Sequence, residues 1–188
     1  MNRLRGDTII ELMLAFSIFS LAAVSTIAIM NRGAAMSQQS LEISLVRAQM
    51  DGQAEAVRYL RDTSSPLWDT IVANHLTTNI APLSPATCPS ASEIRGDDGF
   101  FISQQGANLV IRSSEADFSV PTTYAKIGSE DVADTTSHGL WVQIAKSDSG
   151  SDSHNITAYD VYVHACWDSL VADNVPATLG TIVRIYDK

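Results

Sequence analysis

The apolar residues of this chain are most concentrated in one run near its N-terminus. From Leu12 to Met30 every residue is apolar, apart from three serines and one threonine. A helix of this length rises about 28 Å, close to the roughly 30 Å hydrocarbon core of a bilayer. The run therefore predicts that residues 7–30 form a helix able to cross a membrane.

The helical pattern continues beyond this run. The first 65 residues contain no proline, and apolar residues keep recurring at helical spacing. We therefore expect one helix from about Asp7 to Asp62, whose second half, residues 31–62, is amphipathic and packs beneath a sheet. Gly33 and Gly52 are the positions where this helix should be weakest. The expected packing stripe consists of Leu41, Leu45, Val46, Met50, Ala54, Val57 and Leu60.

Residues 63–188 are expected to form a globular head. The sequence Thr63-Ser64-Ser65-Pro66 ends the long helix and can start a short one, because serine caps helices and proline fits their first turn. A proline-rich loop should follow from Thr77 to Ser92. The apolar positions that suit the short helix are Leu67, Ile71, Val72 and Leu76.

Alternating apolar and polar residues predict strands in the remainder of the head. Two runs flank a turn that contains Gly106, and two others flank the Ser/Asp/Gly-rich stretch Ser147–Asn155, so we expect two hairpins and a final strand. No internal repeat is apparent. The expected strands are Phe100–Ser103, Asn108–Arg112, Leu140–Lys146, Ile156–Trp167 and Thr181–Tyr186.

The charges indicate how the chain is oriented and what it does not bind. Arg3 and Arg5 precede the apolar run, and acidic residues dominate after it, which favours a cytoplasmic N-terminus. The whole chain has 12 basic and 21 acidic residues, and the basic residues beyond the run are scattered singly. Such a surface repels phosphates, so we expect no direct binding of nucleic acid.

Glu11 places a carboxylate directly before the start of the apolar run. An ionised side chain in a membrane is costly unless a positive group meets it, so Glu11 predicts a partner. Thr8 and Glu11 also have the spacing of a capping box at a helix start. The two interpretations are compatible.

The N-terminal residues Met1 to Glu11 resemble the class III leader of type IV pilins, minor pilins and pseudopilins. That leader is short and basic, ends in glycine, and is followed by a glutamate five residues into the mature chain; here these positions are Gly6 and Glu11. Thr8-Ile9-Ile10-Glu11 stands where the family typically has Thr-Leu-Ile-Glu. Asp7 departs from the pattern, since phenylalanine or methionine is usual at the first mature position.

The resemblance implies a processing route and a fold. A prepilin peptidase would remove residues 1–6 by cutting after Gly6 and would methylate Asp7. The mature chain would carry a net charge of −11, because Arg3 and Arg5 leave with the leader. The implied fold is α+β and type IV pilin-like, with a long N-terminal helix packed on a four- or five-stranded antiparallel sheet.

The resemblance also implies a function and partners. The chain would be a structural, non-enzymatic subunit, a minor rather than a major pilin, held in the cytoplasmic membrane before assembly and in an extracellular filament afterwards. Its partners would be other pilin subunits, the peptidase and an inner-membrane assembly platform with an ATPase. Glu11 would pair with the new α-amino group of Asp7 in a neighbouring subunit and set the register.

Three alternatives remain open. The chain could be a pseudopilin of a secretion or DNA-uptake system, which differs in its partners rather than its chemistry. It could be a membrane-tethered binding domain or enzyme outside the membrane, with an uncut N-terminus. An ordinary secretory signal would need a shorter apolar region, and only weak cut sites such as Ser20-Leu21-Ala22 are present.

Cys88 and Cys166 both lie beyond the apolar run. If that side of the membrane is oxidising, they form one disulfide that closes a loop of 78 residues; otherwise they are two buried thiols. On the chain-entropy account the disulfide stabilises the fold by about 4 kcal/mol.

Other candidate sites have simpler interpretations. The four histidines have no metal-ligand spacing with the cysteines, and we expect neither a cofactor nor a metal. Asp97-Asp98 is interpreted as a turn and Asp148–Asp152 as a solvated loop rather than a calcium site. Asn155 matches the glycosylation pattern, and no motif for a catalytic nucleophile or phosphate loop is present.

Overall fold

The fold is described here from a computed structural model. It covers residues 7–82, 86–121, 123–129, 135–147, 157–169 and 175–187. The chain divides into two compact units, Met1–Ser40 and Leu41–Lys188. Met1–Gly6, the Asp148–Asp152 loop and Asn155 lie outside the described residues.

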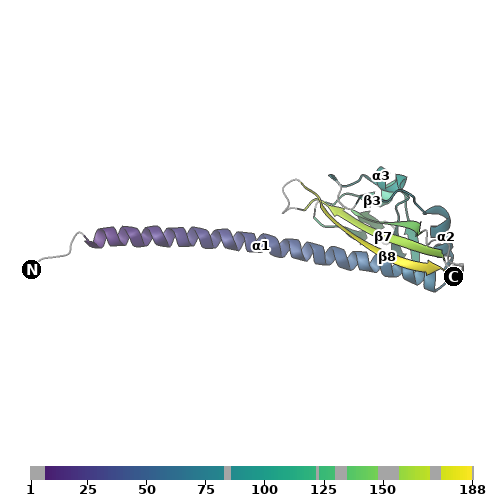
Figure 1. The fold of residues 1–188 in the computed structure, drawn as a ribbon, viewed down its shortest axis with the longest axis horizontal. Coiled ribbons are helices and arrows are strands. Elements are labelled where there is room, and N and C mark those ends of the chain that lie inside the picture. The colour runs from purple at the N-terminus through teal and green to yellow at the C-terminus, as the bar shows by residue number, and fades with distance from the viewer. Residues whose placement is uncertain are drawn as a thin grey trace, which may run out of the picture. The chain divides into compact units, whose positions relative to one another are not determined.

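Helix α1 runs from Asp7 to Asp62 without a break, as the sequence predicts (Figure 1). It passes through Gly33 and Gly52, the two positions where we expected it to be weakest. The absence of proline allows each backbone N–H after the first turn to bond the carbonyl one turn earlier. Within the head, one side of α1 is buried, through Val46, Met50, Ala54, Val57 and Leu60.

Two residues of the expected packing stripe are not in the core. Leu41 is 61% exposed and Leu45 is 40% exposed. Consecutive helical residues differ by about 100° around the axis, so Leu45 and its neighbour Val46 cannot both face the sheet. Val46 takes the core position, with 0% exposure.

The short helices follow local capping signals. Helix α2 spans Pro66–Asn74 as predicted, and the Ser65 side chain accepts a hydrogen bond from the backbone of Leu67. Leu76 lies beyond α2 and forms an isolated bridge with Ile144.

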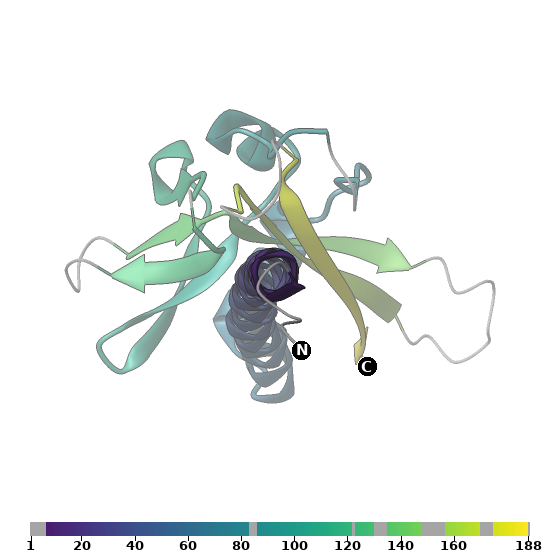
Figure 2. The same cartoon turned by 90° about the vertical axis from the view of Figure 1, so that its left-hand side faces the viewer.

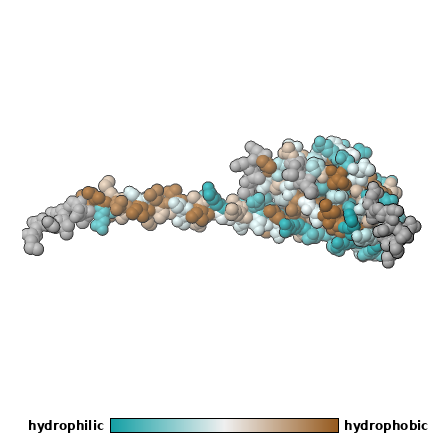
Figure 3. Space-filling model, in the orientation of Figure 1, coloured by the Kyte–Doolittle hydropathy of each residue, from teal (hydrophilic) through white to brown (hydrophobic). Residues whose placement is uncertain are grey.

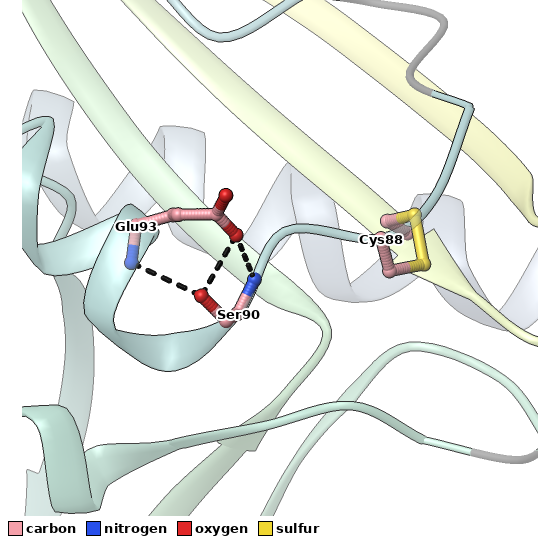
Figure 4. Close-up of a disulfide and its surroundings, with 4 residues drawn as sticks. Cys88, Ser90 and Glu93 are labelled. Atoms are coloured by element: carbon pink, nitrogen blue, oxygen red, sulfur yellow. Dashed lines mark hydrogen bonds between the residues drawn. A yellow bond between two sulfur atoms is a disulfide. The ribbon is translucent and has the colours of Figure 1, made fainter.

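Helix α3, Ala91–Gly96, was not predicted; we expected a loop through Ser92. Its signal is the capping box of Ser90 and Glu93, in which each side chain bonds the other residue's backbone (Figure 4). The proline-rich sequence before it favoured a loop and obscured this signal.

Three antiparallel strands form the sheet that covers α1. Strands β6 (Leu140–Ser147), β7 (Thr157–Trp167) and β8 (Ala177–Asp187) are hydrogen-bonded in that order. The hairpin between β6 and β7 is predicted correctly, whereas β8 begins four residues before the predicted Thr181.

A second predicted hairpin pairs β1 (Phe101–Gln105) with β2 (Asn108–Arg112). Gly106 in its turn has φ +64°, a conformation that glycine adopts without steric cost. Two backbone hydrogen bonds between Phe100 and Val142, of 3.0 and 2.7 Å, connect this hairpin to β6.

A third sheet was not predicted. It contains β3 (Phe118–Ser119), β4 (Lys126–Ser129) and β5 (Thr135–His138), with a parallel β3–β5 pair, and a short 3₁₀ helix, η1 (Glu115–Asp117), precedes it. The α+β class is therefore confirmed. The sheets of the described residues have two or three strands, so the predicted count of four or five in one sheet is not confirmed.

The β6–β7–β8 sheet has a core on each face. Alternate side chains of a strand point to opposite faces, so Val163 and Trp167 pack toward α1, whereas Cys166 packs on the other side beneath Ile94 and Phe101. In Figure 2 the strands cross one side of the helix, and the teal segment that contains α3 lies beyond them.

Two buried glutamines join these layers. The Gln53 amide of α1 donates to the carbonyl of Ile102 and accepts from its N–H, both at 2.8 Å. Gln143 of β6 accepts from the backbone N–H of Ala81 and donates to the carbonyls of Asn79 and Asp97. The nitrogen and the oxygen of both amides each have at least one partner, so burial leaves no polar atom of these side chains unsatisfied.

Candidate functional site

The first half of α1 carries apolar side chains that no other part of the described chain covers. Its large apolar residues from Ile9 to Met30 are each between 58% and 71% exposed (Figure 3). This helix is long and apolar enough to cross a membrane. Exposing so much apolar surface to water is unfavourable, so the segment requires lipid or other proteins around it.

The hydroxyl groups of this segment are satisfied within the helix. Each donates a hydrogen bond of 2.7–2.8 Å to the carbonyl four residues earlier. In an apolar environment such internal bonds remove the cost of an unpaired hydroxyl. The residues that donate are Ser17, Ser20, Ser25 and Thr26.

Glu11 is the remaining polar group of the segment from Ile9 to Met30. It is exposed, and among the described residues it has no hydrogen-bond or ion-pair partner. Asp7 is the first residue of α1, four residues earlier and thus about 6 Å along the axis. Gly6 lies outside the described residues. Thr8 is the second residue of the helix, so it is not the N-cap that the expected capping box requires.

Cys88 and Cys166 are joined by a disulfide, as predicted (Figure 4). Their Cα atoms are 5.5 Å apart and the bond closes the 78-residue separation. It connects the segment before α3 to the end of β7, on the face of the sheet opposite α1. This disulfide excludes the alternative of two free thiols.

His164 is a buried imidazole that sequence reasoning did not single out. It lies on β7 beside two nearly parallel rings, with its centroid 5.2 Å from that of its cross-strand neighbour Trp141 and 6.2 Å from that of Tyr162. Its Nε2 has no hydrogen-bond partner among the described residues. Burial without a compensating charge lowers its pKa from 6.5 to about 4.

The low pKa of His164 predicts a stability loss in mild acid. Between pH 6.5 and about 4 the unfolded chain binds a proton that the folded chain does not. The free energy of unfolding should therefore fall by about 3 kcal/mol as pH decreases through this window. Urea unfolding of the full chain in detergent micelles at several pH values measures this decrease in the free energy of unfolding.

His164→Phe should remove most of this dependence. His75→Gln is the comparison variant and should remove a smaller part of the dependence, since burial also lowers the pKa of His75 but Asp98 opposes the shift. The ion pair of Asp160 with Arg184 lowers the pKa of that carboxyl and so acts at still lower pH. A wild-type curve that is flat from pH 6.5 to 4 would contradict the assignment to His164.

The head also carries an open groove of about 430 Å³. Its lining is polar, with Asn74, His75, Arg95, Asp98 and Glu115 among its residues. Asp97 and Asp98 form the predicted turn, and Asp98 has φ +57°.

Across the described ranges no group of three or more His, Cys, Asp and Glu residues could hold a metal ion. A hydrogen bond of 2.6 Å joins Ser119 and His138. These residues are direct neighbours across the β3–β5 pair, so strand register explains their contact.

Comparison with protein-family models, with curated proteins and with solved structures gave no match. The resemblance to pilins therefore rests on the N-terminal sequence motif and on the chemistry of α1.

Proposed function

We propose that this chain is a subunit of a type IV pilus-like filament, a minor pilin with a pilin-like fold. A prepilin peptidase cuts it after Gly6 and methylates Asp7. Its helix α1 first anchors it in the cytoplasmic membrane and then joins a bundle of like helices. The observation that carries the proposal is Glu11, a carboxylate with no partner among the described residues, in a segment whose other polar groups are satisfied internally.

The proposal gives Glu11 a partner. An unpaired charge in an apolar bundle costs several kcal/mol, whereas an oppositely charged neighbour at the same depth offsets that cost. Cutting after Gly6 creates an α-amino group on Asp7, one helical turn from Glu11 of the same chain. In a bundle the amine of an arriving subunit meets Glu11 of a subunit already present, and the pair sets the axial register.

The head half of α1 offers a second surface suited to helix packing. Opposite its buried side lie Leu41, Leu45, Ala48, Gly52 and Tyr59, all exposed. Their spacing of three, four or seven residues places them on one face. Apart from the adjoining backbone of α1 itself, no atom lies within 4 Å of the position that a Gly52 Cβ would occupy, so another backbone can approach closely there. Glu55, which pairs with Arg58, lies at the edge of this face, three residues after Gly52 and four before Tyr59.

Localisation and partners follow from the same proposal. Before assembly the chain stays in the cytoplasmic membrane with its N-terminus on the cytoplasmic side. An ATP-driven assembly platform then moves it into an extracellular filament. The acidic head is then displayed outside. A pseudopilin of a secretion or DNA-uptake system would use the same processed helix with other companions.

Recovery of the chain from purified filaments tests this function. In cells that assemble such filaments, the chain should be found in the sheared filament fraction only when the prepilin peptidase is present. Gly52→Glu places a charge on the exposed apolar face and should lower recovery about tenfold, which corresponds to roughly 1.4 kcal/mol.

Arg47→Glu is the matched control, since Arg47 is an exposed charged residue of the same helix outside the apolar face. It should leave recovery unchanged. Absence of the wild-type chain from filaments, or its recovery without the peptidase, would contradict the proposal.

A further inference from the structure

Helix α1 makes little apolar contact where the head begins to cover it. Leu41 and Leu45 are 61% and 40% exposed, and Ser44 is also exposed. Ile43 is only partly buried. Val46 is the first residue of α1 that the head buries completely. Apolar packing alone therefore holds the turn before Val46 weakly.

Glu42 attaches that turn of α1 to the head through hydrogen bonds. Its Oε2 accepts a hydrogen bond of 3.2 Å from the indole Nε1 of Trp167 and one of 2.9 Å from the hydroxyl of Ser169. Trp167 is 2% exposed and Ser169 is 8% exposed, so both donors are taken from water. Hydrogen bonds to a charged acceptor are stronger than neutral ones, and a buried donor left unpaired is costly.

The two donors lie at a part of β7 that the disulfide also supports. The strand pairing of β7 with β6 ends at Ala165, and beyond it the backbone N–H groups of Cys166 and Asp168 donate to the carbonyls of Gly139 and Pro121. The pairing of β7 with β8 continues through Cys166 and Trp167. Because successive side chains alternate, Cys166 points away from α1 to its bond with Cys88, and Trp167 points toward α1. The disulfide thus restrains the strand end that presents Trp167 and Ser169 to Glu42.

We propose that Glu42, Trp167 and Ser169 form a clasp that fixes the point at which α1 leaves the head. With the clasp open, the helix is held only from Val46 onward, and its free part lengthens by one turn, about 6 Å. The disulfide keeps the clasp's donors in place, so reduction also opens it. This inference concerns the head alone and does not depend on filament assembly.

Distance measurements between spin labels test the clasp in the full chain in detergent micelles. One label is placed at position 180 of β8, which is exposed, and a second at position 41 or at position 51. Glu42→Ala should broaden the 41–180 distance distribution about twofold and leave the 51–180 distribution unchanged. Alanine favours helix more than glutamate does, so broadening would not come from a weakened helix.

Two controls separate the clasp from general destabilisation. Glu42→Gln keeps an oxygen that accepts both bonds and should retain most of the narrow 41–180 distribution. Glu55→Ala removes a glutamate of α1 that is exposed, whereas Glu42 is half-buried, and it should have no effect. An unchanged distribution in Glu42→Ala, or equal broadening at both positions, would overturn the clasp.

Reduction of the disulfide tests the supporting role of Cys166. With labels attached through reduction-stable bonds, reduction should broaden the 41–180 distribution and leave the 51–180 distribution narrow. A 41–180 distribution that stays as narrow as in the oxidised chain would overturn the part assigned to the disulfide.

Discussion

Glu11→Ala is expected to leave membrane insertion intact and to lower incorporation into filaments at least about tenfold. Insertion should persist because alanine makes the segment from Ile9 to Met30 more apolar. Incorporation should fall because the α-amino group of an arriving subunit would enter an apolar bundle without its carboxylate. The measurement compares the chain in membranes with the chain in sheared filaments.

Two further variants define the role of the charge. Glu11→Gln keeps the size and removes the charge, and should behave like Glu11→Ala. Ser17→Ala is the control within the same segment, since the Ser17 hydroxyl bonds only to the carbonyl of Met13. Normal incorporation of Glu11→Gln would show that the charge does not set the register.

Removing the disulfide should produce the largest loss of head stability. Replacing both Cys88 and Cys166 by serine should lower the free energy of unfolding by about 4 kcal/mol, because the unfolded chain regains the freedom of a 78-residue loop. That is a large part of the roughly 5–15 kcal/mol typical of a domain. Urea unfolding of the oxidised chain and the double variant measures the difference.

The matching control is wild-type protein unfolded under reducing conditions, which should agree with the double variant. Cys166 is 1% exposed, so the buried serine hydroxyl that replaces it adds a small cost to the variant alone. A difference below about 1 kcal/mol between oxidised and reduced protein would contradict this account of the disulfide.

The elements that the sequence predicted well have strong local signals. Helix α1 follows from a long stretch without proline, and the β1–β2 hairpin from two short apolar runs around Gly106. The β6–β7 hairpin follows in the same way. In each case the pattern spans one element and its immediate neighbour, so no distant contact is needed to recognise it.

The elements that it missed either depend on contacts elsewhere in the chain or have a local signal that neighbouring residues obscured. Strand β5, with the sequence Thr-Thr-Ser-His, carries no apolar alternation and is a strand because β3 and β4 pair with it. Helix α3 has a capping box that the surrounding prolines obscured. Leu45 belongs to the apolar pattern of α1, yet Val46 beside it takes the core position.

The candidate site divides in the same way. Glu11 and the pair Cys88 and Cys166 were predicted, because a charge in an apolar run and two cysteines stand out in any sequence. Glu42 and His164 were not. Glu42 accepts a hydrogen bond from Trp167, which lies 125 residues later in the chain. His164 lacks a partner among the described residues because it is buried, and its burial cannot be recognised from sequence periodicity alone.

The mass of the N-terminal peptide isolated from cells tests the central claim most directly. We expect a chain that begins at Asp7 and carries a methyl group on its α-amine, which requires both the cut after Gly6 and the activity of a prepilin peptidase. A chain that retains Met1, as a membrane-tethered domain would, or one cut near Ala22 by a signal peptidase, would contradict the proposed function.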